Sequence, residues 1–286
     1  WQRATTGSAV NAFVYASADR WEMVRSSINK ATDSLGKTYA NVVCGNWADN
    51  NYISQIIEGT NEMSGKTLTF SFTISSSTLS DGRVYIRHLN GSTWTTAVWS
   101  DVFTYSSTDT VKTYTFTLPS TKIDQIQVFI YGHAGTSNEN GNSFNIKNVQ
   151  LELGSVATDF EHRSYGEELA LCQRYYYKID GGGYTWIAEV QRHNSTGFRS
   201  VISLPVAIRD KPTISYSNLA YWYNNGSINN GTSSISLGYT SSSATDITQL
   251  NIEYVPTSMS LTNNSNLSAM LSFTSAGGYL AFDAEL

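Results

Sequence analysis

The chain has 286 residues, of which 14% are charged and 13% aromatic, and its formal net charge is −5. This length suits two domains, and a negative chain without clustered Lys and Arg does not favour nucleic-acid binding, because phosphate recognition needs cationic side chains. No apolar run approaches the ~20 residues that a membrane-spanning helix needs, so we expect no membrane insertion.

The first half of the chain alternates apolar and polar residues with a period of two, which predicts β-strands with one buried face. The clearest runs cover residues 68–74, 114–118 and 126–130, and turn residues occur at 80–82, 90–92 and 139–142. Many short strands joined by polar turns predict a jelly-roll β-sandwich over residues 1–155.

A candidate binding site lies on the outward side of these strands. If Val84 and Ile86 point into the core, parity places five residues outward: Tyr85, Arg87, Gln127, Phe129 and Tyr131. Rings mixed with Arg and Gln are typical of a sugar platform, because rings stack on a pyranose and polar groups bind its hydroxyls. We expect Trp94 and Trp99 to close one end. The alternative is that residues 1–21, residues 42–57 or a neighbouring subunit cover this face.

Residues 156–180 form a predicted linker with one short helix. Ser164 and Glu167 make a capping box, and Glu167 and Glu168 occupy the first turn, where the helix dipole favours acids. The glycines at 181–183 are expected to end the helix. One helix face carries Leu169, Cys172 and Tyr176. Because a helix this short is marginal alone, we expect that face to pack near the threefold axis of a homotrimer.

Alternation resumes over residues 181–286 and predicts a second β-sandwich-like domain. Within it, three aromatic residues precede an Asn/Gly-rich loop that runs to residue 231; this group comprises Tyr221, Trp222, Tyr223, Asn224 and Asn225. Rings beside small hydrogen-bonding side chains are typical of an adaptable binding surface, so we expect a tip that contacts a receptor. The alternative is that the three aromatic residues alternate along an ordinary strand.

Signals for catalysis and for metal binding are weak. The 23 acidic residues supply nominal carboxylate pairs, but no motif surrounds any pair. The four His are scattered singly, and neither His-x-x-x-His nor Cys-x-x-Cys occurs. Cys44 and Cys172 are expected to be free, buried thiols. We therefore expect a protein that is not an enzyme and that holds no cofactor and no metal.

Three segments resemble parts of tailed-phage fibre and receptor-binding proteins. The most specific runs from Val149 through Gly154-Ser-Val-Ala-Thr-Asp-Phe160 to Tyr177; the others are Trp1-Gln-Arg-Ala-Thr-Thr with Ala18-Asp-Arg-Trp21, and Gly278-Tyr-Leu-Ala-Phe-Asp-Ala-Glu-Leu286. The resemblance implies a carbohydrate-binding-module-like jelly roll, joined through this linker to a distal β-domain that trimerises. Such modules often hold calcium beside a last-strand carboxylate, which Ile146-Lys-Asn-Val149 lacks, so we carry no calcium over.

The resemblance also implies a place and partners. We expect a virion structural protein, a tail fibre or receptor-binding protein, assembled in the host cytoplasm. Its expected partners are copies of itself, other virion proteins and host-surface carbohydrate. Two alternatives remain open: a capsid decoration protein or head fibre with the same architecture, and a carbohydrate-active tailspike-type enzyme.

Overall fold

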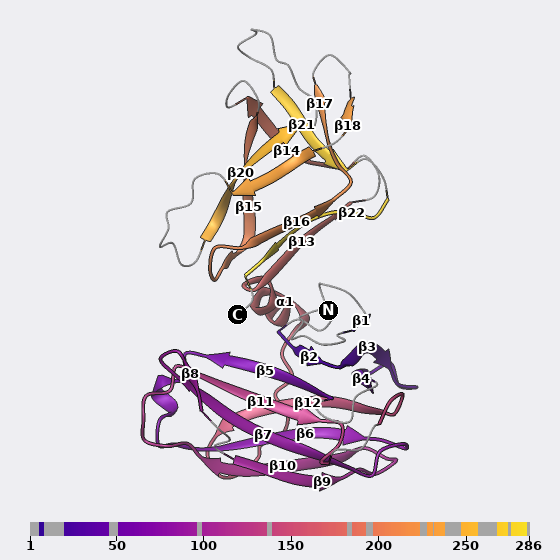
Figure 1. Ribbon diagram of the computed structural model, residues 1–286, viewed down its shortest axis with the longest axis vertical. Coiled ribbons are helices and arrows are strands. Elements are labelled where there is room, and N and C mark those ends of the chain that lie inside the picture. The colour runs from indigo at the N-terminus through magenta and orange to yellow at the C-terminus, as the bar shows by residue number, and fades with distance from the viewer. Residues whose placement is uncertain are drawn as a thin grey trace. The chain divides into compact units, whose positions relative to one another are not determined.

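The structure, a computed structural model, describes residues 6–8, 20–45, 51–95, 99–135, 139–181, 185–192, 197–223, 228–230, 232–237, 247–256, 268–273 and 276–284. The chain divides into two compact units, Trp1–Arg163 (unit 1) and Ser164–Leu286 (unit 2). In the described residues the regular structure is almost all β-strand, with one α-helix (Figure 1). The predicted all-β class is confirmed. The boundary falls inside the predicted linker, so its helix belongs to unit 2.

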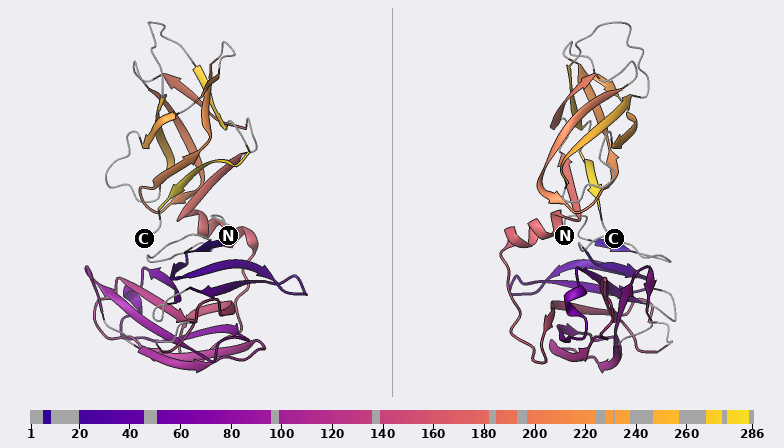
Figure 2. Two further views of the ribbon diagram at one scale, coloured as in Figure 1. Left: turned by 45° about the vertical axis from the view of Figure 1, so that its right-hand side comes forward. Right: turned by 90° about the vertical axis from the view of Figure 1, so that its left-hand side faces the viewer.

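Unit 1 is a jelly-roll sandwich of two antiparallel sheets (Figure 2). The first sheet has the order β1 (Thr6–Ser8), β3 (Ser26–Thr32), β4 (Thr38–Cys44), β12 (Ser143–Leu153), β6 (Thr67–Ser75) and β10 (Thr110–Thr117). The second has the order β2 (Glu22–Val24), β5 (Tyr52–Glu58), β11 (Gln125–Tyr131), β7 (Asp81–Asn90) and β8 (Thr93–Trp94), and β9 (Trp99–Thr104) also pairs with β7. A 3-10 turn, η1 (Asn61–Met63), precedes β6.

The core of unit 1 contains the apolar residues that the alternation predicts. They are Leu68, Phe70, Phe72 and Ile74 on β6, Val84 and Ile86 on β7, and Ile126, Val128 and Ile130 on β11. However, β6 is buried on both faces, not on one as predicted. Its Thr69 is completely buried, and the Thr69 hydroxyl donates to the Gly154 carbonyl at 2.8 Å. The chain that follows β12 therefore covers the polar face of this strand at Thr69.

Two of the three predicted turns are confirmed, and the third is wrong. Gly91 and Gly141 have φ of 63° and 82°, in the left-handed region that favours glycine, at 90–92 and 139–142. By contrast, Asp81 and Gly82 begin β7. A Cβ on Gly82 would lie 2.5 Å from Phe103 Cζ, so this glycine allows close packing and does not mark a turn.

Unit 2 contains α1 (Tyr165–Gln173) and two further antiparallel sheets. One has the order β13 (Tyr176–Gly181), β22 (Gly278–Asp283) and β16 (Thr213–Ser217). The other has the order β18 (Ile228–Asn230), β17 (Leu219–Tyr223), β21 (Ser268–Phe273), β14 (Trp186–Arg192), β15 (Phe198–Ile208), β20 (Ile247–Pro256) and β19 (Thr232–Leu237). The core of unit 2 draws on both sheets and includes Phe198, Leu250, Tyr254, Leu271, Phe273 and Phe282.

The helix begins as predicted but ends early. Glu167 N donates to Ser164 Oγ at 3.3 Å and Ser164 N donates to Glu167 Oε2 at 3.0 Å, which confirms the capping box. The helix stops at Gln173, and Tyr176 is the first residue of β13, paired with Asp283. The predicted helix face of Leu169, Cys172 and Tyr176 is therefore wrong. A run of aromatic residues after Arg174 favours a strand, and β22 supplies its partner.

Glycine also has a packing role in unit 2. Gly181 and Gly278 are paired opposite each other across β13 and β22. A Cβ on Gly181 would lie 1.9 Å from Phe273 Cδ2, and one on Gly278 would lie 2.7 Å from Phe273 Cβ. The expectation that the glycines at 181–183 end the helix is wrong, because Gly181 closes a strand and makes room for the Phe273 ring.

Candidate functional site

The side of the second sheet of unit 1 that points away from the core is called the outer face here, and it collects residues from five strands, β2, β5, β7, β8 and β11. Strand register places Tyr85 of β7 opposite Phe129 of β11, and Arg87 opposite Gln127. On the other side of β11, Phe129 faces Ser54 of β5. Because side chains alternate along a strand, these residues share one face.

Aromatic rings on the outer face pack edge to face. The Phe129 ring is 5.2 Å from the Tyr52 ring and 5.2 Å from the Tyr85 ring, both T-shaped, and the Tyr131 centroid lies 4.8 Å from that of Tyr52. Phe129 is only 3% exposed, whereas Tyr85 and Tyr131 are half-buried. The expected open platform is therefore not what the structure shows, because its central ring is covered.

A guanidinium group covers part of that ring. The Arg87 Cζ atom lies 5.0 Å from the centroid of Phe129 and 4.6 Å from that of Trp94, which are cation–π distances. Arg87 Nε and Nη2 both donate to Gln127 Oε1, at 2.9 Å and 2.7 Å. Two rings and one amide thus fix the position of the Arg87 side chain.

Two buried groups, Glu22 and Ser54, fix the Gln127 amide in turn. Gln127 Nε2 donates to Glu22 Oε2 at 2.8 Å and to Ser54 Oγ at 3.1 Å, and Ser54 Oγ donates to Glu22 Oε2 at 2.9 Å. Gln127 is 1% exposed, Ser54 is completely buried and Glu22 is 6% exposed. With its NH₂ group committed to Glu22 and Ser54, Gln127 must turn its oxygen toward Arg87.

Sequence reasoning missed Glu22, Tyr52 and Ser54. Residues 42–57 are predicted only as a segment that could cover this face, and Glu22 is far from Gln127 along the chain. Strand parity on β5 would place Tyr52 and Ser54 on one side, but it does not say which sheet they join. Only the pairing of β2 and β11 with β5 brings them to Gln127.

Burial raises the pKa of two phenol groups on this face, those of Tyr52 and Tyr131. It raises the pKa of Tyr52 well above its usual value, and it raises the pKa of Tyr131 to about 12, with Tyr85 adding to the rise. Arg83 and Arg87 oppose the shift at Tyr131, and Arg87 and Arg25 oppose it at Tyr52. The Tyr52 and Tyr131 hydroxyls therefore remain hydrogen-bond donors over the physiological pH range and well above it.

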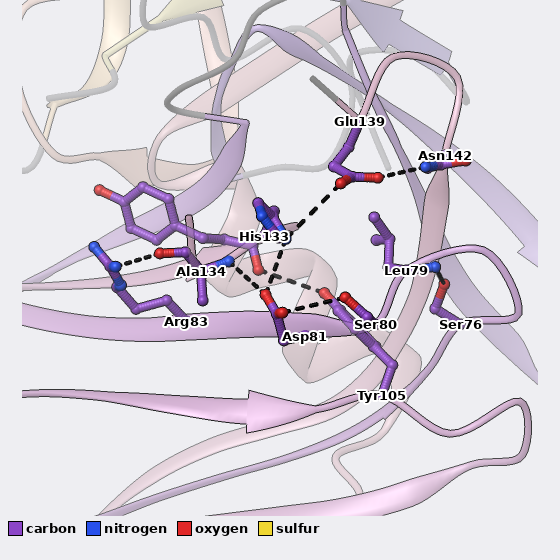
Figure 3. A network of polar contacts seen from close by, with 11 residues as sticks. Ser76, Leu79, Ser80, Asp81, Arg83, Tyr105, His133, Ala134, Glu139 and Asn142 are labelled. Carbon is purple, nitrogen blue, oxygen red and sulfur yellow. Dashed lines mark hydrogen bonds and ion pairs between the residues drawn. The ribbon is translucent and has the colours of Figure 1, made fainter. Parts of the chain in front are cut away.

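A second polar network lies where β7 begins (Figure 3). Asp81 Oδ1 accepts a hydrogen bond from Ala134 N at 2.9 Å, and His133 Nδ1 lies 2.9 Å from the same oxygen. Arg83 Nη2 donates to the Ala134 carbonyl oxygen. The Glu139 carboxylate approaches His133 Nδ1 to 3.9 Å. These contacts connect the chain after β11 to β7 and hold Arg83 at one end of the outer face.

The remaining predicted binding residues lie elsewhere or outside the described residues. Trp99 is the first residue of β9, opposite Ile86, and its side chain is not described. Tyr221, Trp222 and Tyr223 are the last three residues of β17, as the strand alternative predicted, and part of the expected loop forms β18. Asn224 and Asn225 lie outside the described residues.

Within the described ranges, no three His, Cys, Asp or Glu side chains are grouped so that they could hold a metal ion. A search of the same residues finds no helix with the length and apolar character needed to cross a membrane. Neither Cys44 nor Cys172 forms a disulfide; Cys44 is buried as predicted, whereas Cys172 is only half-buried. Burial raises the pKa of the Cys44 thiol to about 12, with Glu139 adding to the rise. Such a thiol is unreactive at neutral pH.

No protein-family model matches this chain, and no curated protein matches it. Several solved structures resemble it over about half its length. A CBM4 structure shares 19% identity over 45% of this chain and 78% of its own, with a TM-score of 0.35. The C-terminal family 22 carbohydrate-binding module of Clostridium thermocellum Xyn10B shares 13% identity over 51% of this chain and 93% of its own, with a TM-score of 0.38. Tailspike protein 4 of bacteriophage CBA120 shares 12% identity over 48% of this chain and 19% of its own, with a TM-score of 0.35.

Proposed function

We propose that unit 1 binds carbohydrate through its outer face and does not catalyse a reaction on it. The observation that carries this proposal is the fixed position of Arg87 between Trp94 and Phe129, with Gln127 holding its guanidinium. Sugars are bound by rings beside polar groups of fixed orientation, and such preorganisation lowers the entropic cost of binding. The half-buried Tyr85 and Tyr131 supply ring edges and hydroxyls beside this group.

The alternative is that the outer face only stabilises the fold. Replacing a buried polar network by apolar residues of similar size is often neutral or stabilising, so stability alone gives no reason for Glu22, Gln127 and Arg87 here. A network whose inner end is buried and whose outer end is half-exposed is better suited to orient a group toward a ligand.

A test of carbohydrate binding removes one ring at a time. Tyr85→Ala and Tyr131→Ala should each weaken binding on a glycan array by roughly 1 kcal/mol or more, since aromatic contacts contribute about this much. Tyr39→Ala, which truncates a half-buried tyrosine on β4 in the other sheet, is the matched control and should bind normally. Unchanged binding by both outer-face variants would contradict the proposal, as would a wild-type chain that binds no glycan.

We further propose that the chain is a structural protein of a tailed-phage virion, as a tail fibre or receptor-binding protein. The support is the resemblance of residues 149–177 and of the two ends of the sequence to such proteins. A capsid decoration protein or head fibre would use the same architecture at another place. A cryo-EM map of the intact particle distinguishes them, and density for this chain on the capsid would overturn the tail assignment.

Homotrimer formation through α1 is the proposed assembly. In unit 2, α1 has no fully buried residue, Tyr165 is 82% exposed and Leu171 is 36% exposed. Exposed apolar side chains such as these are more stable when a second chain covers them. Light scattering should give a trimer for the wild type and a monomer for Tyr165→Ser combined with Leu171→Ser. A monodisperse wild-type monomer would contradict this assembly.

We also propose that the segment after β17 contacts the host receptor. The connection 224–227 joins β17 to β18, and Tyr221, Trp222 and Tyr223 precede it. A Gly/Ser replacement of 224–227 should reduce host adsorption and leave the oligomeric state unchanged. Full adsorption by this variant would move the receptor contact to unit 1.

A further inference from the structure

The two arginines on the outer face, Arg83 and Arg87, have no acidic partner among the described residues. Arg87 donates to the neutral oxygen of Gln127, and Arg83 donates to the neutral carbonyl of Ala134. Neither guanidinium forms an ion pair with any residue that the structure describes. Half-buried cations are usually paired, because desolvation of a charge is costly.

The nearby carboxylates are occupied by other donors. Glu22 Oε2 accepts hydrogen bonds from both Gln127 and Ser54. Asp81 accepts from Ala134 N and from Ser80 Oγ, and it lies beside His133. Positive charge on Arg83 and Arg87 is therefore directed outward, although the chain as a whole carries a formal charge of −5.

The orientation of Arg87 leaves one edge of its guanidinium for a ligand. Nε and Nη2 donate to Gln127 Oε1, and Nη1 donates to no acceptor among the described residues. The rings of Trp94 and Phe129 hold the guanidinium plane. A planar, prepositioned N–H edge suits a carboxylate or phosphate oxygen, since charge-assisted hydrogen bonds are about twice as strong as neutral ones.

We infer that the outer face of unit 1 recognises an acidic saccharide, with Arg87 donating to an anionic oxygen of the sugar. This inference rests on the proposal that the same face binds carbohydrate, and it names the chemical class of the ligand. Arg83 lies four residues before Arg87 on β7, with Tyr85 between them, so it adds positive potential on the same side. Glu22 is a positioning residue, because it acts through the Gln127 amide and not on the ligand.

The first experiment compares polymers that differ in charge. Probes are polygalacturonate, its fully methyl-esterified form and a phosphorylated mannan, with binding to the full chain measured by titration calorimetry. We expect binding to at least one anionic polymer, at least about tenfold weaker binding to the esterified one, and weakening with added NaCl. The carboxylate and phosphate arms show which anionic group is preferred.

The outcomes separate the two proposals. Equal affinity for polygalacturonate and its ester, with binding intact, would overturn the acidic ligand and leave carbohydrate binding standing. A chain that binds none of these polymers and no glycan on an array would overturn both. These comparisons use the wild-type chain, so they do not depend on how any variant folds.

The second experiment changes the guanidinium. Arg87→Gln should lower affinity for the anionic polymer by about tenfold or more and affinity for its ester by a smaller factor, because a hydrogen bond to a charged oxygen is stronger than one to a neutral oxygen. Arg87→Lys should recover only part of the loss, because an ammonium lacks the planar fork. Arg83→Gln tests the same charge without disturbing the Gln127 amide. Lys122→Gln removes an exposed cation that pairs with Asp124, and it should bind like the wild type. Equal losses for the anionic polymer and its ester would contradict the inference.

Discussion

The two units bury polar groups in different ways. In unit 2, the buried Tyr254 hydroxyl and the Ser200 hydroxyl are 2.8 Å apart within the core, so their polar atoms satisfy each other. In unit 1, the network of Glu22, Ser54 and Gln127 lies on the outer face and ends at the half-buried Arg87. A closed pair contributes to stability alone, whereas a network with an open end can also present a group to a ligand.

Packing also differs between the units. Unit 2 uses Gly181 and Gly278 to admit one ring, Phe273, into its core. Unit 1 uses a cluster of tyrosines and Phe129 on its outer face, next to charged side chains. The comparison teaches that aromatic content alone does not identify a binding surface. Charged partners beside the rings are what distinguish the outer face from the core of unit 2.

The largest difference between the units is expected in alkali. Burial raises the pKa of four described tyrosines in unit 1, namely Tyr52, Tyr105, Tyr114 and Tyr131, and of Tyr254 in unit 2. A phenol whose pKa is higher in the folded chain than the unfolded value of 10.0 contributes its full stabilisation below pH 10. This stabilisation is lost as the pH rises to about 12, because the unfolded chain loses the phenol proton first. Unit 1 should therefore unfold first above pH 10. Tyrosine absorbance and separate melting of each unit would check this, and earlier unfolding of unit 2 would break the comparison.

Next in size is the packing of Phe273. Phe273→Ala should lower the free energy of unfolding of unit 2 by about 3–5 kcal/mol, because it removes a completely buried ring. Gly181→Ala should cost about 1–3 kcal/mol by overpacking. In the Phe273→Ala background, the added methyl has space and should cost little. Denaturant unfolding of the two single variants and the double variant measures this coupling, and additive losses would show that Phe273 is not what Gly181 accommodates.

A smaller loss is expected when the network on the outer face is cut. Gln127→Leu removes the partner of Arg87 and one donor to Glu22, which should lower the stability of unit 1 by about 2 kcal/mol. It should also weaken glycan binding, because the guanidinium is no longer held. Thermal melting and the glycan array provide the two readouts. Loss of stability with unchanged binding would make the network purely structural, like the pair in unit 2.

The smallest effect should come from the closed pair of unit 2. Tyr254→Phe removes the hydroxyl that contacts Ser200 and should cost about 1 kcal/mol. Glycan binding by unit 1 should not change, which makes this variant the counterpart of Gln127→Leu. A binding defect in Tyr254→Phe would show that the two kinds of buried polar group cannot be separated in this way.

Much of the fold follows from local pattern. The two-residue period predicted the buried faces of β6, β7 and β11, because alternate side chains of a strand face opposite sides. The Ser164 and Glu167 pair predicted the start of α1, because capping depends on residues three apart. The end of α1 was wrong, since the pairing of Tyr176 with Asp283 on β22 is a distant contact that local periodicity does not contain.

The sequence by itself determined the all-β class, the short helix and the parity that puts Tyr85, Arg87 and Phe129 on one side of their strands. Only the tertiary structure decided what that side presents. Strand pairing brings Glu22 and Ser54 to Gln127, and it places the Arg87 guanidinium over the Phe129 ring. The face therefore presents a guanidinium of fixed position where an open aromatic platform was expected. The physical reason is that alternation depends on neighbouring residues, whereas burial and hydrogen bonding depend on which distant strands lie side by side.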